Sequence, residues 1–138
     1  MTFVLVELES VEALGMATLA GRTLVVDGLD EEWDETFIGT YFFVRLGKNE
    51  DVTRLRTRMI EGPLEDPATG SAASDLAAYL SLEDGGDGKA LKYEIVQGIE
   101  MGRRSEILLE VEMNEDRSIS RVHLEGGAVQ VMEGRLTV

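Results

Sequence analysis

The segment 62–80 brings together a carboxylate, hydroxyl groups and a run of small residues, immediately before a long apolar stretch. Pro67 disfavours the α conformation at Asp66, so Asp66 is expected to lie in extended backbone just ahead of a helix. Gly70 allows the backbone to approach a ligand closely, and the small side chains after it keep that approach unobstructed. These residue types predict a site where an acidic side chain and a helix N-terminus face one small molecule.

The chemistry expected at this site is the binding of an anion. The first N–H groups of a helix have no partner inside the helix, and the helix dipole adds partial positive charge there. A substrate carboxylate is a natural ligand for such a helix end. A carboxylate at Asp66, a hydroxyl at Ser71 and free amides beside them would form a site for a small carboxylic acid.

The same residues have a purely structural interpretation, which the residue types alone leave open. Asp and Thr are favoured at helix N-caps, so Asp66 and Thr69 could cap the helix while Ser71 occupies its first turn. The segment does not match a phosphate-binding loop, because no Gly-Lys-Ser or Gly-Lys-Thr follows the glycine.

Two strongly apolar regions are predicted to be central to the fold. The helix predicted over 71–82 is apolar on almost every side, and a helix of that kind is expected to be buried all round. The region 2–8 is almost continuously apolar, so it is predicted to be a strand buried on both faces and not an edge of the sheet.

The region 52–60 has the clearest period-two pattern in the chain. Thr, Leu and Met alternate there with Arg54, Arg56 and Arg58, which predicts a strand with the arginines on one face.

Ser10 is a predicted N-cap for a short helix over 11–14. Further strands are predicted over 23–27, 36–46, 91–97, 106–113, 118–124, 129–132 and 135–138. Together these elements predict one α+β domain, 1–138, with a mixed, barrel-like β-sheet wrapped around a central α-helix.

The composition excludes several classes of function. The chain of 138 residues has 27 acidic and 13 basic residues, giving a formal net charge of −14. Nucleic acid and anionic membrane surfaces both require clustered Lys and Arg, so neither is expected as a partner. Because the chain has no cysteine and one histidine, no metal site is expected, and His123 is expected to be structural. A signal peptide and a membrane span of about 18 apolar residues are not found, so a cytoplasmic location is expected.

One string is similar to the signature of the PhzF (phenazine biosynthesis-like) family: Glu65-Asp66-Pro67-Ala68-Thr69-Gly70-Ser71-Ala72, followed by an alanine-rich helix. Other segments also resemble that family. They are the opening strand 2–8, the segment 97–105 with the pattern QG-x-x-x-GR-x-S, and the closing segments 126–129 and 134–136. The resemblance covers nearly the whole chain and corresponds to the C-terminal lobe of the family.

The resemblance implies the diaminopimelate-epimerase-like fold, with two similar lobes and an active site between their central helices. It implies an isomerase or epimerase that uses no cofactor or metal and shifts a proton on a small carboxylic acid. In the phenazine pathway that acid is a dihydro-hydroxyanthranilate. By motif position, Asp66 would be the catalytic carboxylate. Substrate binding would fall to Thr69, Gly70, Ser71 and Ala72.

The resemblance also implies that half of the site is missing from these residues. The family's main acid–base glutamate belongs to the first lobe, and no residue here corresponds to it. A partner lobe is therefore expected, either as a separate polypeptide or as a second copy of this chain. A homodimer is expected, with 128–138 exchanged between subunits. The alternative is a catalytically silent, truncated lobe that serves as a dimeric binding or structural module.

Overall fold

The computed structural model describes residues 1–22, 24–30, 37–84 and 89–135 of the chain. Its strands form one mixed sheet in the order β1-β2-β3-β5-β6-β7, and the short strand β4 pairs with β3. The strands are β1 (Thr2–Glu7), β2 (Ile38–Asn49), β3 (Val52–Glu61), β4 (Leu64–Asp66), β5 (Ala90–Gln97), β6 (Ser105–Met113) and β7 (Ile119–Gly126). The helices are α1 (Val11–Met16) and α2 (Gly70–Asp84).

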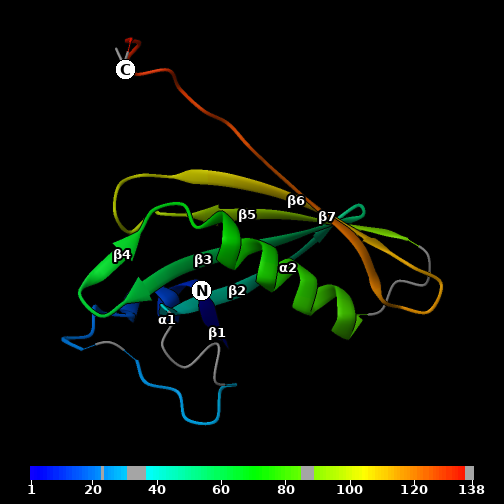
Figure 1. Ribbon diagram of the computed structural model, residues 1–138, viewed down its shortest axis with the longest axis horizontal. Helices are drawn as coiled ribbons and strands as arrows, with labels where there is room; N and C mark the ends of the chain where they lie inside the picture. Colours follow the sequence, from blue (N-terminus) through cyan, green and yellow to red (C-terminus); the bar gives the residue numbers. More distant parts are fainter. Residues whose placement is uncertain (23, 31–36, 85–88, 136–138) are drawn as a thin grey trace.

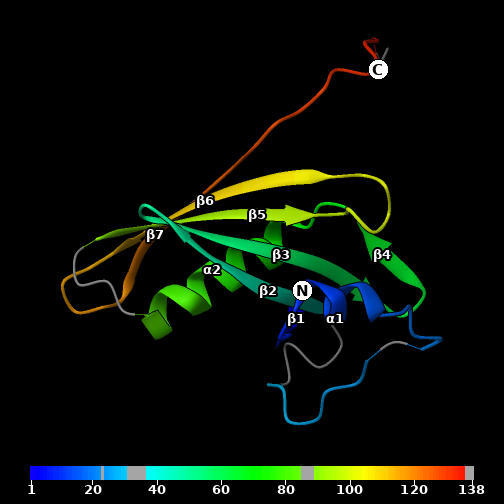
Figure 2. The same cartoon turned by 180° about the vertical axis from the view of Figure 1, so that it is seen from behind.

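The sheet curls around α2 without closing into a complete barrel (Figure 1). Helix α2 lies in front of the sheet in Figure 1 and behind it in Figure 2, and α1 lies against the opposite face. The predicted α+β fold is therefore confirmed, with the barrel-like sheet present as a half-barrel packed on its central helix.

The core lies between the concave face of the sheet and one side of α2. The buried residues of the helix recur every three or four positions, as one face of a helix does: Ala72, Ala73, Leu76, Ala77, Leu80 and Ser81. The opposite side is exposed, with Tyr79 at 46% and Leu82 at 51% of full exposure. The prediction that this helix is buried all round is wrong for the described chain, because the half-barrel covers only one side of it.

Two parallel pairings decide which ends of the elements meet. Strand β1 pairs in parallel with β2, and β3 pairs in parallel with β5 after a connection through β4 and α2. A helix that joins two parallel strands begins near their carboxyl ends. The register places Thr57 of β3 beside Gln97 of β5, near the end of the sheet where α2 begins.

Among the described strands β1 lies at the edge of the sheet, so the prediction that it is not an edge is wrong for the part of the chain that the structure describes. Its described partner is β2, while Phe3 and Leu5 pack against the core cluster beneath α2. The rest of the strand is half-buried except for Glu7, which is exposed. An apolar sequence predicts that the two faces of a strand are covered by other side chains. It does not predict whether both edges of the strand are paired with neighbouring strands.

Two of the predicted strands do not form. Residues 24–27 have no strand structure, and Thr23 lies outside the described residues. Residues 127–135 run as an extended arm away from the body (Figure 1), with Val129 and Val131 each 85% exposed. Their β-branched side chains favour extended backbone, but a strand also needs a partner for its backbone N–H and C=O groups. The remainder of the strand predicted over 135–138 lies outside the described residues.

Elsewhere the predicted elements are present with boundaries shifted by a few residues. The side chain of Ser10 accepts a hydrogen bond from the amide of Ala13 at 3.1 Å, which confirms it as the N-cap of α1. Over the part of the chain that the structure describes, no helix combines the length and apolar character required to cross a membrane.

Candidate active site

A cavity of about 450 Å³ opens beside the first turn of α2 and brings together most of the predicted site residues. Asp66, Thr69, Gly70 and Ser71 line it, and Ala72 does not. Its remaining walls are mainly apolar, with Met1, Phe3, Phe37, Met59, Leu64, Glu65, Pro67 and Ala68. Such a cavity suits a small molecule that has an anionic end and an apolar body.

Asp66 is the last residue of β4, in the extended backbone predicted from Pro67. Its Oδ2 accepts a hydrogen bond from the hydroxyl of Thr69 at 2.7 Å, and its Oδ1 accepts a longer one from the amide of Ala68 at 3.3 Å. Among the described residues no cation forms a salt bridge with Asp66. A carboxylate has about four acceptor positions, so Asp66 keeps acceptor capacity for a ligand.

The first turn of α2 contains amides without recorded partners. The helix starts with a hydrogen bond from the Ala73 amide to the Thr69 carbonyl at 3.0 Å. Within the described ranges, no hydrogen bond is found for the amides of Gly70, Ser71 or Ala72. Ser71 is exposed and Gly70 half-buried, whereas Ala72 is fully buried. The amides of Gly70 and Ser71 are thus the ones placed to meet an anion.

The capping alternative does not describe the geometry that is found. The side chains of Asp66 and Thr69 bond to each other, and the hydroxyl oxygen of Thr69 also accepts from Nε2 of Gln97 at 3.0 Å. Neither side chain bonds to an amide of α2 in the described structure. The two residues therefore form a polar cluster ahead of the helix and leave its N-terminus open.

Gln97, at the end of β5, belongs to this cluster, and the sequence did not indicate it as a site residue. Its side chain is fully buried. Its Nε2 donates to the carbonyl of Asp66 at 2.7 Å and to Thr69, while its Oε1 accepts from the hydroxyl of Tyr41 at 2.9 Å. Its signals in the sequence were its place at the end of an apolar strand and as the first residue of the QG-x-x-x-GR-x-S segment.

Tyr41 and Thr57 continue the cluster into the core. Both are fully buried, and their hydroxyl oxygens lie 3.0 Å apart. Burial raises the pKa of Tyr41, so its phenol keeps the proton that it donates. The polar cluster therefore joins β2, β3 and β5 to the segment that carries Asp66.

Arg58 holds the same segment from the other side of the sheet. It donates two hydrogen bonds to the carboxylate of Glu65, at 2.7 and 2.9 Å, and two more to the carbonyls of Leu14 and Ala17 at the end of α1. The bonds to Glu65 raise the pKa of Arg58. Because Glu65 is paired in this way, Asp66 is the only carboxylate without an ion-pair partner among the described residues that line the cavity.

The other arginines of β3 are also balanced by carboxylates. Arg56 pairs with Glu100 at 2.5 Å and Arg54 with Glu94 at 3.7 Å. The predicted row of arginines on one face of the strand is confirmed, but none of them lines the cavity. No Lys or Arg side chain is among the described residues that line the cavity, so the helix amides are the candidate binding groups for a substrate carboxylate there.

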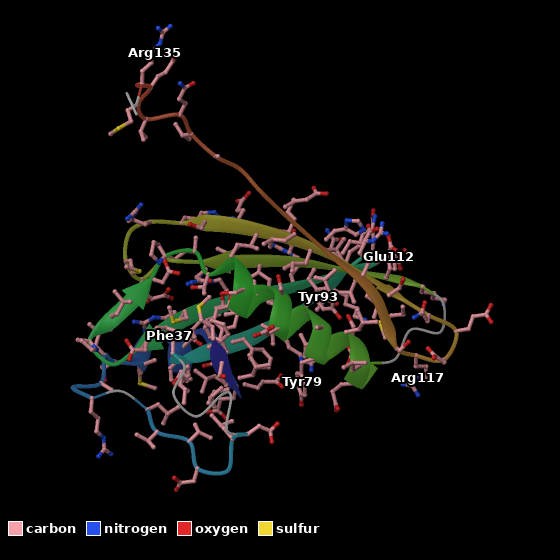
Figure 3. All side chains as sticks on the ribbon, in the orientation of Figure 1. Phe37, Tyr79, Tyr93, Glu112, Arg117 and Arg135 are labelled. Carbon is pink, nitrogen blue, oxygen red and sulfur yellow. The ribbon has the colours of Figure 1, made fainter. Side chains whose placement is uncertain are left out.

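His123 lies far from the cavity. Its Nε2 is 3.0 Å from Oε1 of Glu112. Glu112 and Phe37, which lines the cavity, are at opposite ends of the body in Figure 3. This position agrees with the structural role predicted for His123. The described residues include no cluster of three or more His, Cys, Asp or Glu side chains that could hold a metal ion.

Comparison with known proteins agrees with the fold. A family model described as "Phenazine biosynthesis-like protein" matches residues 1–134. An uncharacterized isomerase from Mesorhizobium japonicum is 34% identical over 110 residues, which cover 78% of this chain and 35% of that protein. A trans-2,3-dihydro-3-hydroxyanthranilate isomerase from Pseudomonas chlororaphis is 36% identical over 88 residues, which cover 62% of this chain and 31% of that protein.

The match to each of these longer proteins thus spans about a third of its length. The match to the family model, in contrast, extends over almost all of this chain and includes the segment 65–72 and Gln97. The chain belongs to the phenazine biosynthesis-like (PhzC-PhzF) family and is homologous to its isomerases, corresponding to a single lobe of them.

Proposed function

We propose that this chain supplies one half of the active site of a cofactor-independent isomerase or epimerase, which moves a proton on a small carboxylic acid. The observation that carries the proposal is the cavity where the Asp66 carboxylate lies beside the unbonded amides of Gly70 and Ser71. The amides and the Ser71 hydroxyl would hold the substrate carboxylate. Asp66 would bind a polar group of the substrate or relay the proton.

A second lobe would supply the other acid–base group. Moving a proton between two positions requires a donor and an acceptor, and Asp66 is the one unpaired carboxylate found on the described walls. The exposed side of α2, with Tyr79 and Leu82, offers a surface for that lobe. A lobe that reached from this surface over the first turn of α2 would also exclude water from the cavity, which strengthens hydrogen bonds to developing charge.

Solvent exchange tests the proposal. The assembly isolated from its source is incubated in D2O with α-chiral and β,γ-unsaturated acids, including the dihydro-hydroxyanthranilate named for the Pseudomonas relative. We expect deuterium to enter at least one acid, and Asp66→Ala to slow its entry by about 100-fold or more, as loss of a general acid–base group does. Asp51→Ala is the control, because Asp51 is exposed in the turn between β2 and β3.

A second candidate function is a catalytically silent module that binds a partner or a ligand. The single unpaired carboxylate in the cavity favours this candidate for the chain by itself. Equal exchange in the Asp66→Ala and Asp51→Ala assemblies, or no exchange into any acid, would support the silent module and contradict the isomerase.

We further propose that the partner lobe is a second copy of this chain and that the arm 127–135 is exchanged between copies. The arm exposes Val129, Val131 and Met132, each at 85%, and Figure 3 shows Arg135 far from the body. Burying one such side chain against a partner contributes about 1.5–3 kcal/mol. Among the described strands β1 pairs with β2, so its other edge would accept an added strand.

Light scattering at micromolar concentration should therefore give twice the mass of one chain. Val129→Lys combined with Val131→Lys should shift the protein toward the monomer, because charged side chains resist burial in an interface. Val25→Lys is the control, since Val25 is 81% exposed outside the arm. A monomeric wild-type protein, or equal effects of the two sets of substitutions, would contradict the exchange.

A further inference from the structure

The amide of Gln97 has only one orientation that satisfies its neighbours. One of its two polar atoms lies 2.7 Å from the carbonyl oxygen of Asp66, which can only accept a hydrogen bond. The other lies 3.3 Å from the backbone N–H of Thr69, which can only donate. The nitrogen must therefore face Asp66 and the oxygen must face the amide of Thr69.

This orientation fixes the direction of the hydrogen bonds that Gln97 and Thr69 make. The side-chain oxygen of Gln97 can only accept a hydrogen bond, so the hydroxyl of Tyr41 donates its single hydrogen to that oxygen. The hydroxyl of Tyr41 also lies 3.0 Å from the hydroxyl oxygen of Thr57. Gln97 donates from Nε2 to the hydroxyl oxygen of Thr69. The hydroxyl hydrogen of Thr69 is left with Oδ2 of Asp66, 2.7 Å away.

We propose that Gln97 is a positioning residue for Asp66. It directs the Thr69 hydroxyl to Oδ2 of Asp66 in a short bond of 2.7 Å, whereas Oδ1 accepts only the longer 3.3 Å bond from the Ala68 amide and is the oxygen with more capacity to meet a ligand. The inference rests on the proposed function, because that function is what gives Asp66 a ligand to meet. The geometry of the hydrogen bonds can be measured without a substrate.

The burial of the polar cluster supports a role beyond packing. Tyr41, Thr57 and Gln97 are each fully buried in a core that is otherwise mainly apolar. A buried polar group must be fully hydrogen-bonded to avoid a large desolvation penalty, and apolar residues of the same shape are often equally stable. What apolar side chains would not provide is a donor directed at Thr69 and an anchor for the carbonyl of Asp66.

The test compares two isosteric changes at pH 7 by NMR. Gln97→Met removes the donor to Thr69 and Asp66. The control is Tyr41→Phe combined with Thr57→Val, which removes two buried hydroxyls and the bond from Tyr41 to Gln97 but keeps the groups by which Gln97 donates to Asp66 and Thr69. Three-bond couplings report the χ1 rotamer of Thr69, and the side-chain carboxyl carbon of Asp66 reports its hydrogen bonding.

The wild type and the control should each show one Thr69 rotamer and the same Asp66 carboxyl resonance. Gln97→Met should show averaged rotamers and a shifted resonance, even where urea denaturation gives it the same stability as the control. If Gln97→Met does not fold, Gln97→Glu replaces it, because an ionised Glu of the same size has no hydrogen to donate and draws the Thr69 hydroxyl away from Asp66.

Several rotamers in the wild type would overturn the proposal, as would an unchanged Asp66 resonance in the Gln97 variant or an equal change in the control. A separate titration of the wild type with benzoate, followed at the amides of Gly70 and Ser71, tests anion binding. Failure of benzoate to shift those amides would count against the proposed function and would leave the rotamer result to decide the role of Gln97.

Discussion

Replacing Arg58 with methionine is expected to lower the free energy of unfolding by about 3–5 kcal/mol, the usual cost of breaking a buried ion pair. Both side chains are well covered, with Arg58 at 7% and its partner Glu65 at 11% exposure. The substitution leaves the Glu65 carboxylate buried without a partner. It also removes the donor to the carbonyls of Leu14 and Ala17, which hold α1 against the sheet. Urea denaturation measures the change.

The control for this prediction is Arg54→Met on the same face of β3. Arg54 is 47% exposed and lies 3.7 Å from Glu94, so solvent screens the pair and its loss should cost at most about 1 kcal/mol. Equal losses from the two substitutions would show that the hydrogen bonds of Arg58 do not hold α1 and β4 in place. A small loss from Arg58→Met alone would lead to the same conclusion.

Changing Gly98 to alanine should cost about 3 kcal/mol and displace the segment that carries Asp66. Gly98 has a φ of +79°, where a side chain is strained by about 1–2 kcal/mol. A Cβ at this position would overlap the carbonyl oxygen of Arg103 and lie 2.8 Å from that of Pro67. Making room for the added Cβ costs about 1–3 kcal/mol more, because the backbone atoms of Arg103 and Pro67 must move.

Gly102→Ala separates the two contributions. Gly102 also has a positive φ, of +68°, but no atom lies within 4 Å of the added Cβ. It should therefore lose about 1–2 kcal/mol in the same urea experiment, from backbone strain alone. In NMR spectra, Gly98→Ala should shift the amides of Ala68 and Thr69, and Gly102→Ala should not. Identical effects at the two glycines would mean that the close approach to Pro67 is unimportant.

Local patterns in the sequence predicted the elements that carry the site. The alternation over 52–60 identified β3 and its arginine face, and the Pro67 signal placed Asp66 in extended backbone before α2. The N-cap at Ser10 was found for the same reason, since capping involves residues only three positions apart. Each of these features depends on nearby residues, so one sequence is sufficient to indicate it.

The features that depend on distant segments were not predictable in this way. The contacts of Gln97 with Tyr41 and Asp66 span 56 and 31 positions, and they follow from the parallel register of β3 and β5. The edge position of β1 and the exposed side of α2 depend on how far the sheet curls. Propensity describes a segment by itself, whereas these properties belong to pairs of segments.

The parallel pairing of β3 with β5 also bears on the order of events as the chain folds. Asp66 and helix α2 are translated well before Gln97. A nascent chain that ends at α2 therefore lacks the side chain that donates a hydrogen bond to Thr69. Parallel neighbours separated by a crossover are slow contacts to form, because the intervening loop must first be closed. The proposed anion site should therefore mature only when β5 docks against β3, and ligand affinity should appear together with that pairing.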